Sequence, residues 1–174
     1  MKNIILILLI ALVFLIACTQ QKIDGQTKPD VMIEKSTDVM EKEASMEKGE
    51  NNYQGEILAG SLTPYLEFNE ADYQKAQAEN KIILLNFYAN WCPICKAEES
   101  KAYAAYNELK LENVVAFRVN YKDSQTDSFE ESLAQKFQIP YQHTKVIIKD
   151  GKQILKTPDS WDKARYIKKL NSLA

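Results

Sequence analysis

The chain has 174 residues, 22 Lys and Arg against 24 Asp and Glu, a net charge of −2, three cysteines and one histidine. A slightly acidic chain without a basic patch or nucleic-acid motif is a poor partner for nucleic acid, which we exclude. A zinc finger is excluded as well, because the chain lacks the second Cys/His pair that a structural zinc site needs at matching spacing. We expect no cofactor.

Residues 1–17 have the layout of an export signal. A lysine at position 2 precedes an unbroken apolar run over 4–16, which is too short for a comfortable membrane span. The sequence Leu-Ile-Ala-Cys at 15–18 resembles the lipobox of bacterial lipoproteins, and this resemblance implies cleavage before Cys18 and lipid attachment to it. The alternative is an uncleaved signal anchor. Both alternatives tether the protein to a membrane of the cell envelope, outside the cytoplasm, where disulfide chemistry is permitted.

Residues 18–55 are predicted to form a flexible, mostly disordered tether. They are rich in Gln, Lys, Glu, Asp and Ser and have no sustained apolar face. Met32, Met40 and Met46 lie among charged residues in this segment. A copper-binding methionine cluster is one reading of them, but we interpret them as part of a solvated spacer.

Residues 56–174 are long enough for one α/β core. Continuous apolar runs such as 82–88 are typical of strands buried on both faces. The expected order of strands and helices belongs to a mixed central sheet flanked by helices on both faces. In chain order the patterns predict strand 65–68, a helix from the Asn69 cap to about 79, strand 82–88, helix 96–110, strand 114–119, a helix from the turn at 123–127 to 137, a hairpin of strands 146–148 and 153–155, and a helix capped by Asp159 or Ser160 that carries Trp161 and runs to Leu170.

A Cys-x-x-Cys sequence follows the second predicted strand and begins a helical stretch. It reads Trp91-Cys92-Pro93-Ile94-Cys95. Unpaired N–H groups and the positive end of the dipole at a helix N-terminus stabilise a thiolate, so we expect Cys92 to be the more exposed and more acidic thiol and the nucleophile. Cys95, one helical turn later, is close enough to attack a mixed disulfide on Cys92 and is interpreted as the resolving thiol.

Two other interpretations of the Cys-x-x-Cys spacing compete with redox chemistry. One is half of a metal site, for which a matching second pair is missing. The other is a purely structural disulfide, which would gain little because a four-residue loop has little closure entropy to remove. The sequence supports both of these interpretations less well than a redox-active pair of cysteines at a strand-to-helix junction.

The predicted order of elements, with this motif at the second strand-to-helix junction, resembles the thioredoxin superfamily over essentially all of 56–174. The string Phe-Tyr-Ala-x-Trp-Cys-x-x-Cys-Lys at 87–96 and the hairpin turn Lys-Asp-Gly-Lys at 149–152 carry the resemblance. It implies a thioredoxin-like fold, a redox disulfide Cys92–Cys95, Trp91 packed beside it, and protein-disulfide oxidoreductase activity.

A tethered, exported member resembles the membrane-anchored thiol-disulfide oxidoreductases of cell envelopes. The partners implied are exported proteins with thiols or disulfides and a membrane protein that donates or accepts electrons. The Pro93-Ile94 dipeptide does not decide the direction of electron flow. The resemblance favours reduction or isomerisation over oxidation.

Two positions depart from the pattern of the family. Asn86 stands where thioredoxins carry a buried aspartate, so proton transfer must use water, His143 or another group. A simple role for Asn86 as a hydrogen-bonded polar residue is compatible with this. The family also places a cis proline opposite the cysteines. A gapless count puts His143 there, with a trans or strained peptide before it, whereas a competing alignment puts Pro140 there. We favour the gapless count.

An imidazole beside two thiols has several uses. His143 would stabilise the thiolate as a cation, accept a proton as a neutral base, or join Cys92 and Cys95 as a third ligand for a soft metal. A histidine that only packs or is solvated is the simpler reading. No metal is expected in the first interpretation. The alternative functions are a metal-binding or metal-delivery module using these three residues and a redox-inactive binding domain that retains the fold.

Overall fold

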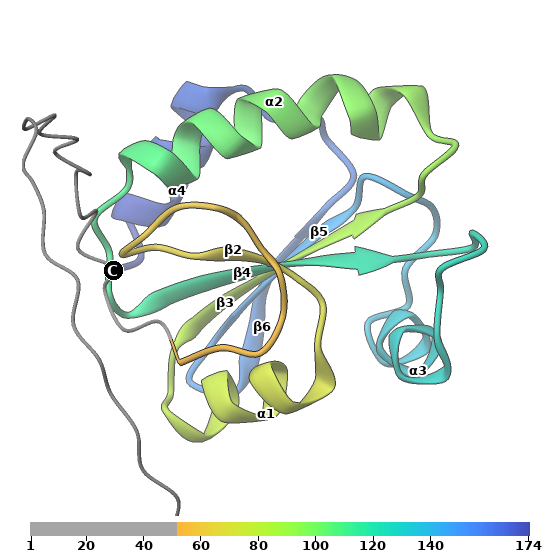
Figure 1. The fold of residues 1–174 in the computed structure, drawn as a ribbon, viewed down its shortest axis with the longest axis horizontal. Helices are drawn as coiled ribbons and strands as arrows, with labels where there is room; N and C mark the ends of the chain where they lie inside the picture. The colour runs from red at the N-terminus through yellow and green to blue at the C-terminus, as the bar shows by residue number, and fades with distance from the viewer. Residues whose placement is uncertain (1–51) are drawn as a thin grey trace, which may run out of the picture. The chain divides into compact units, whose positions relative to one another are not determined.

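The computed structural model describes residues 52–174 (Figure 1). The predicted signal at 1–17, Cys18 and the methionines at 32, 40 and 46 lie outside the described residues. Within 52–174, no helix has the length and apolarity required to cross a membrane.

The strands and helices agree closely with those predicted, with one strand more. The additional strand, β1, has only three residues, and so short an apolar run does not identify a strand in the sequence. In chain order the elements are β1 (Ile57–Ala59), β2 (Tyr65–Glu67), α1 (Glu70–Ala78), β3 (Ile82–Tyr88), α2 (Pro93–Glu108), β4 (Val114–Asn120), α3 (Ser128–Lys136), β5 (Lys145–Lys149), β6 (Lys152–Thr157) and α4 (Lys163–Asn171).

The strands form one mixed sheet in the order β1-β2-β4-β3-β5-β6. β2, β4 and β3 run parallel, while β1, β5 and β6 join by antiparallel pairing. α1 and α3 cover one face of the sheet, and α2 and α4 cover the other (Figure 1). The predicted fold class, a thioredoxin-like mixed sheet flanked by helices, is therefore confirmed.

β3 is central because both of its faces are buried. Ile83, Leu85 and Phe87 pack in the cluster beneath α1 and α3, and Ile82 and Leu84 pack in the cluster beneath α2 and α4. Successive side chains of a strand point to opposite faces, so only an apolar residue at nearly every position fills both layers. Each such side chain contributes about 1.5–3 kcal/mol when fully buried. The strand thereby fixes the position of the loop that follows Tyr88.

The predicted start of the last helix is wrong. Asp162, rather than Asp159 or Ser160, caps α4, because its side chain accepts a hydrogen bond of 2.8 Å from the backbone N–H of Arg165. The Asp159 carboxylate instead pairs with the Arg165 guanidinium at 2.8 Å. Trp161 therefore precedes the helix and is buried beneath it at 1% exposure.

Residues 53–55, just before the predicted start of the domain at 56, contact the folded domain. Tyr53 packs against the core beneath α1. The backbone N–H groups of Gln54 and Gly55 donate to the Asp72 carboxylate at 3.0 and 2.7 Å. Because Asp72 is only 1% exposed, its charge requires these partners. Residues 53–55 therefore pack on the domain and are not part of a free tether.

Candidate active site

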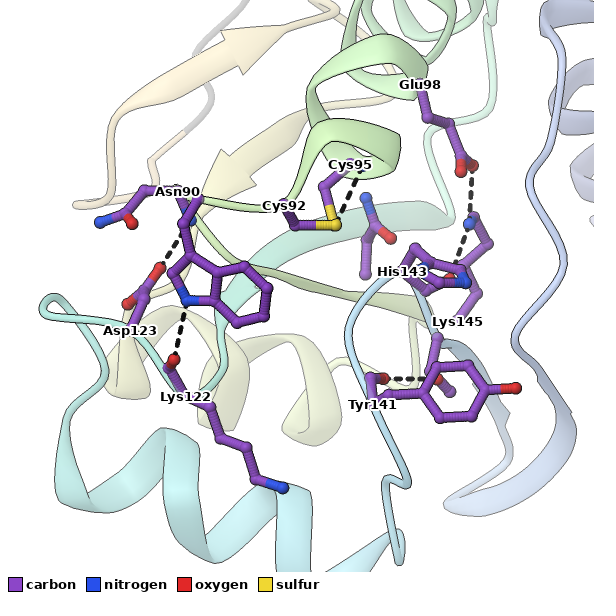
Figure 2. Close-up of a disulfide and its surroundings, with 12 residues drawn as sticks. Asn90, Cys92, Cys95, Glu98, Lys122, Asp123, Tyr141, His143 and Lys145 are labelled. Atoms are coloured by element: carbon purple, nitrogen blue, oxygen red, sulfur yellow. Dashed lines mark hydrogen bonds and ion pairs between the residues drawn. A yellow bond between two sulfur atoms is a disulfide. The ribbon is translucent and has the colours of Figure 1, made fainter.

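The two cysteines lie at the junction between β3 and α2 (Figure 2). Cys92 and Cys95 form a disulfide, with Cα atoms 5.3 Å apart. Cys92 is the N-cap of α2, and its sulfur accepts a hydrogen bond of 3.2 Å from the backbone N–H of Cys95. Pro93 at the first helical position lacks only an N–H that would have no partner in the helix. The helix thus begins three residues earlier than the predicted 96, which puts the positive end of its dipole at the Cys92 sulfur.

Exposure does not distinguish the two cysteines as predicted. Cys92 and Cys95 are both 5% exposed, so the expectation that Cys92 is the more exposed is wrong for the disulfide form. Both pack in a small cluster with Tyr88 and Ala89. The surface near them carries three exposed large side chains, which we call the apolar rim: Trp91, Ile94 and Tyr141.

The loop before the cysteines is held by the loop after β4. The indole N–H of Trp91 donates to the carbonyl of Lys122 at 3.0 Å, and the backbone N–H of Asn90 donates to the Asp123 carboxylate at 2.8 Å (Figure 2). These contacts join segments from two strands that are neighbours in the sheet. Trp91 is anchored at its nitrogen while its ring stays 56% exposed.

His143 lies beside the cysteine pair, as the gapless count predicted. A ring nitrogen of His143 and the two sulfurs all lie within 4.8 Å of one another. Pro140, the competing candidate, is exposed, and no peptide bond within 52–174 is cis. The peptide before His143 is therefore trans.

The backbone of His143 is held in a left-handed conformation, with φ of 53°. Its N–H donates to the carbonyl of Phe87 at 2.7 Å, and its carbonyl accepts from the Lys145 ammonium at 3.0 Å. A left-handed non-glycine residue costs about 1–2 kcal/mol, so these hydrogen bonds stabilise a conformation that the residue would not otherwise adopt. The backbone of His143 is thereby fixed relative to β3 and β5.

The charge state of His143 follows from its surroundings. Partial burial, and then the neighbouring Lys145 ammonium, lower the pKa of His143 from its ordinary 6.5, while Glu98 opposes them. The imidazole is neutral at pH 7. Of the roles predicted for it, proton acceptor and ligand therefore fit the structure better than a permanent cation.

A buried ion pair lies behind His143, and the sequence analysis did not predict it. Glu98, one turn after Cys95 on α2, contacts the Lys145 ammonium at 2.6 Å, with side chains 5% and 0% exposed (Figure 2). The ammonium also donates to the carbonyls of His143 and Asp159 at 3.0 and 3.1 Å, so its three protons are all used. Burial lowers the pKa of Lys145, and the Glu98 carboxylate opposes this. The pair connects α2 to the His143 loop.

The same Glu98 oxygen holds the start of α4. It accepts from the backbone N–H of Trp161 at 3.0 Å and from the Tyr166 hydroxyl at 2.7 Å. A glutamate in a helix and a lysine at the start of a strand resemble surface residues in the sequence. The only signal in the sequence that could have predicted this pair was spacing. Glu98 follows Cys95 by one helical turn, and Lys145 follows His143 by two residues.

Asn86 is partly buried, and its amide donates to the Tyr65 hydroxyl at 3.0 Å. This hydrogen bond agrees with the interpretation of Asn86 as a satisfied polar residue in β3. Burial raises the pKa of the Tyr65 hydroxyl far above its ordinary value, so the phenol stays protonated. The Asn86–Tyr65 pair therefore supplies no base at neutral pH.

In the reduced protein, iodoacetamide near pH 7 is expected to label Cys92 before Cys95. Cys92 caps α2 at the positive end of its dipole, whereas Cys95 lies inside the first turn. Fragmentation of the peptide that holds both cysteines measures the order of labelling. The rate at which iodoacetamide labels Cys92 should be unchanged in the Cys95→Ser variant. Faster labelling of Cys95 would reverse the two roles.

The site is a buried Cys-x-x-Cys disulfide at the N-terminus of α2, in an α/β fold, with the left-handed residue His143 beside it. This combination defines the class of proteins that use a dithiol/disulfide pair. The thioredoxin family model matches residues 64–172. The chain therefore belongs to the thioredoxin family.

The chain is similar to several known proteins. The thiol-disulfide oxidoreductase ResA of Oceanobacillus iheyensis is 32% identical over 78 residues, which are 43% of this chain and 40% of that protein. The match thus spans well under half of that relative. The solved Trxlp of Edwardsiella tarda is 22% identical with a TM-score of 0.48 and covers 57% of this chain and 92% of its own. Thioredoxin of Aeropyrum pernix is 16% identical with a TM-score of 0.49, and the match covers 63% of this chain and 87% of that thioredoxin.

Proposed function

We propose that this chain is a protein thiol-disulfide oxidoreductase. The observation that carries the proposal is the Cys92–Cys95 disulfide, whose first sulfur caps α2. Membership of the thioredoxin family and the likeness to a relative named as a thiol-disulfide oxidoreductase support it.

The chemistry is an exchange of two electrons between disulfides. In the reductive direction, the Cys92 thiolate attacks one sulfur of a substrate disulfide, and the other substrate sulfur leaves as a thiolate that takes up a proton. The Cys95 thiolate then attacks the Cys92 sulfur of the mixed disulfide and releases the second substrate thiol. The dithiol is oxidised to the disulfide, and the substrate disulfide is reduced to two thiols. The ring nitrogen of neutral His143 lies within 4.8 Å of both sulfurs, so a small rotation of the side chain or one intervening water would let it accept a proton from either cysteine.

The substrates we infer are exported proteins with thiols or disulfides. The apolar rim of Trp91, Ile94 and Tyr141 gives an extended polypeptide a surface to bind near the sulfurs. We infer reduction or isomerisation as the working direction, with a membrane protein as electron donor or acceptor.

The reduction potential of the Cys92/Cys95 couple tests the direction, and insulin reduction by the dithiothreitol-charged protein tests the activity. We expect turnover of insulin and a potential nearer the roughly −270 mV of thioredoxin than the roughly −120 mV of a strong oxidant. Equilibration with glutathione or dithiothreitol buffers measures the potential. A reduction potential near that of the strong oxidant would mean that the protein oxidises its substrates, by the same thiol-disulfide exchange. A protein without any thiol-disulfide exchange would contradict the proposal.

We further propose that the mature chain is anchored in the cell envelope by lipid on Cys18. The support is the sequence Leu-Ile-Ala-Cys at 15–18 after the apolar run. Cys18→Ser should leave the precursor uncleaved and move the protein out of the detergent phase in which a lipidated form partitions. Insulin reduction by residues Cys92 and Cys95 should be unchanged. An intact mass of the native protein without lipid would exclude the anchor.

A further inference from the structure

Three potential metal ligands from two elements meet at the active site. They are the sulfurs of Cys92 and Cys95 on α2 and a ring nitrogen of His143, which precedes β5, all within 4.8 Å of one another. Two thiols and an imidazole are a ligand set for thiophilic cations with a filled d shell, such as Zn²⁺ and Cu⁺. A sheet and a helix bring the three together, so the cluster does not depend on one flexible loop.

The spacing suits tetrahedral coordination once the disulfide is reduced. Zn–S distances of about 2.3 Å and Zn–N distances of about 2.0–2.1 Å require ligand atoms about 3.5–3.8 Å apart. Reduction frees the two sulfurs to separate to that distance, and the imidazole nitrogen needs to approach them by about 1.3 Å at most from the observed limit of 4.8 Å. Side-chain rotation supplies such a movement.

The imidazole nitrogens are available, and the backbone that carries the ring is held in place. Within 52–174, no residue forms a hydrogen bond with the ring nitrogens of His143, whose nearest aromatic neighbour is Tyr141 with centroids 5.4 Å apart. Its backbone is fixed by Phe87 on one side and Lys145 on the other. A ligand that is free at its nitrogen and fixed at its backbone is prepared for coordination.

We propose that the reduced protein binds one thiophilic cation, Zn²⁺ or Cu⁺, through Cys92, Cys95 and His143. A dithiol or phosphine reductant first gives two electrons to the disulfide; the two protons come from the dithiol, which becomes a disulfide, or from water, whose oxygen is taken up as the phosphine oxide. The cation then replaces the protons of the two thiols, which are released to water. A fourth position stays open to water or to a thiol of a partner, the pattern of a catalytic or transport site and not of a structural one. The metal and the disulfide exclude each other, so oxidation of the pair releases the cation.

This inference goes beyond the proposed function because it requires two thiols but no turnover. A protein that reduces insulin and binds no metal would contradict only the inference, and a protein that binds metal without reducing insulin would contradict only the proposed activity.

The test uses the full-length chain carrying Cys18→Ser, in detergent and without a histidine tag, so that the proposed ligands are its only thiols and its only imidazole. Co²⁺ added to the phosphine-reduced protein should give thiolate charge-transfer and tetrahedral d–d bands at one equivalent, and Zn²⁺ should displace it. The oxidised protein should give neither signal. NMR of histidine-labelled protein should show the single imidazole signal shift on addition of one equivalent of Zn²⁺.

His143→Asn is the matched variant, because asparagine tolerates the left-handed backbone and lacks the imidazole. It should bind Zn²⁺ at least about tenfold more weakly, while circular dichroism and formation of the disulfide show that the fold is kept. Equal Zn²⁺ affinity in His143→Asn, or an imidazole signal that Zn²⁺ leaves unmoved, would show that two thiols alone account for binding and would overturn the proposal.

Discussion

Replacing Cys92 with serine is expected to lower insulin reduction to the uncatalysed rate, because a hydroxyl at the N-cap of α2 cannot attack a disulfide. Cys95→Ser should behave differently. It keeps the attacking sulfur and lacks the resolving thiol, so it should accumulate one equivalent of mixed disulfide on Cys92 with no further turnover. Intact mass under non-reducing conditions measures this adduct.

A matched comparison makes the assignment of roles specific. Cys18→Ser should retain the full rate of insulin reduction, since it leaves both sulfurs of the Cys92–Cys95 pair in place. If Cys92→Ser instead accumulated the mixed disulfide and Cys95→Ser did not, Cys95 would be the nucleophile.

Glu98→Ala is expected to reduce the free energy of unfolding by about 3–5 kcal/mol, the usual cost of breaking a buried pair from one side. The Lys145 ammonium, fully buried, would lose its counter-ion. The backbone N–H of Trp161 and the Tyr166 hydroxyl would lose the acceptor that they share. Urea unfolding followed by circular dichroism measures the change.

The chain offers two controls for this prediction. In Glu98→Gln with Lys145→Met, the amide oxygen of Gln still accepts from Trp161 and no charge is left buried, so most of the lost stability should return. Lys163→Met breaks the exposed pair between Lys163 and Glu108, whose side chains are 47% and 58% exposed, and should cost about 1 kcal/mol or less. A Glu98→Ala loss as small as that of Lys163→Met would mean that the buried pair contributes little.

Local patterns in the sequence determined the elements that carry the site. β3 was predicted with its observed bounds because a strand buried on both faces must be apolar at nearly every position. The junction of that strand with a Cys-x-x-Cys and a helix-forming stretch predicted both cysteines at the start of α2. These signals lie within a few residues of one another, and local physical chemistry is sufficient to produce them.

The resemblance to the thioredoxin superfamily, counted without a gap, placed His143 at the cysteines, but the sequence left Pro140 as a competitor. Tertiary structure decided between them. The hydrogen bonds from the His143 N–H to Phe87 and from Lys145 to the His143 carbonyl join the turn at His143 to β3 and β5. They hold a left-handed backbone that histidine seldom adopts.

The short edge strand β1, the position of Trp161 before α4 and the Glu98–Lys145 pair were also decided only by the tertiary structure. β1 has three residues, so its pairing with β2 and not its own pattern makes it a strand. Glu98 and Lys145 lie on a helix and a strand whose sequences are compatible with exposed charges. Whether a charge faces solvent or a partner depends on what packs over it. Here Trp161, which precedes α4, lies beside both residues, and Tyr166 of α4 contacts Glu98. Burial of that kind is a property of the packed layers, so the sequence by itself does not record it.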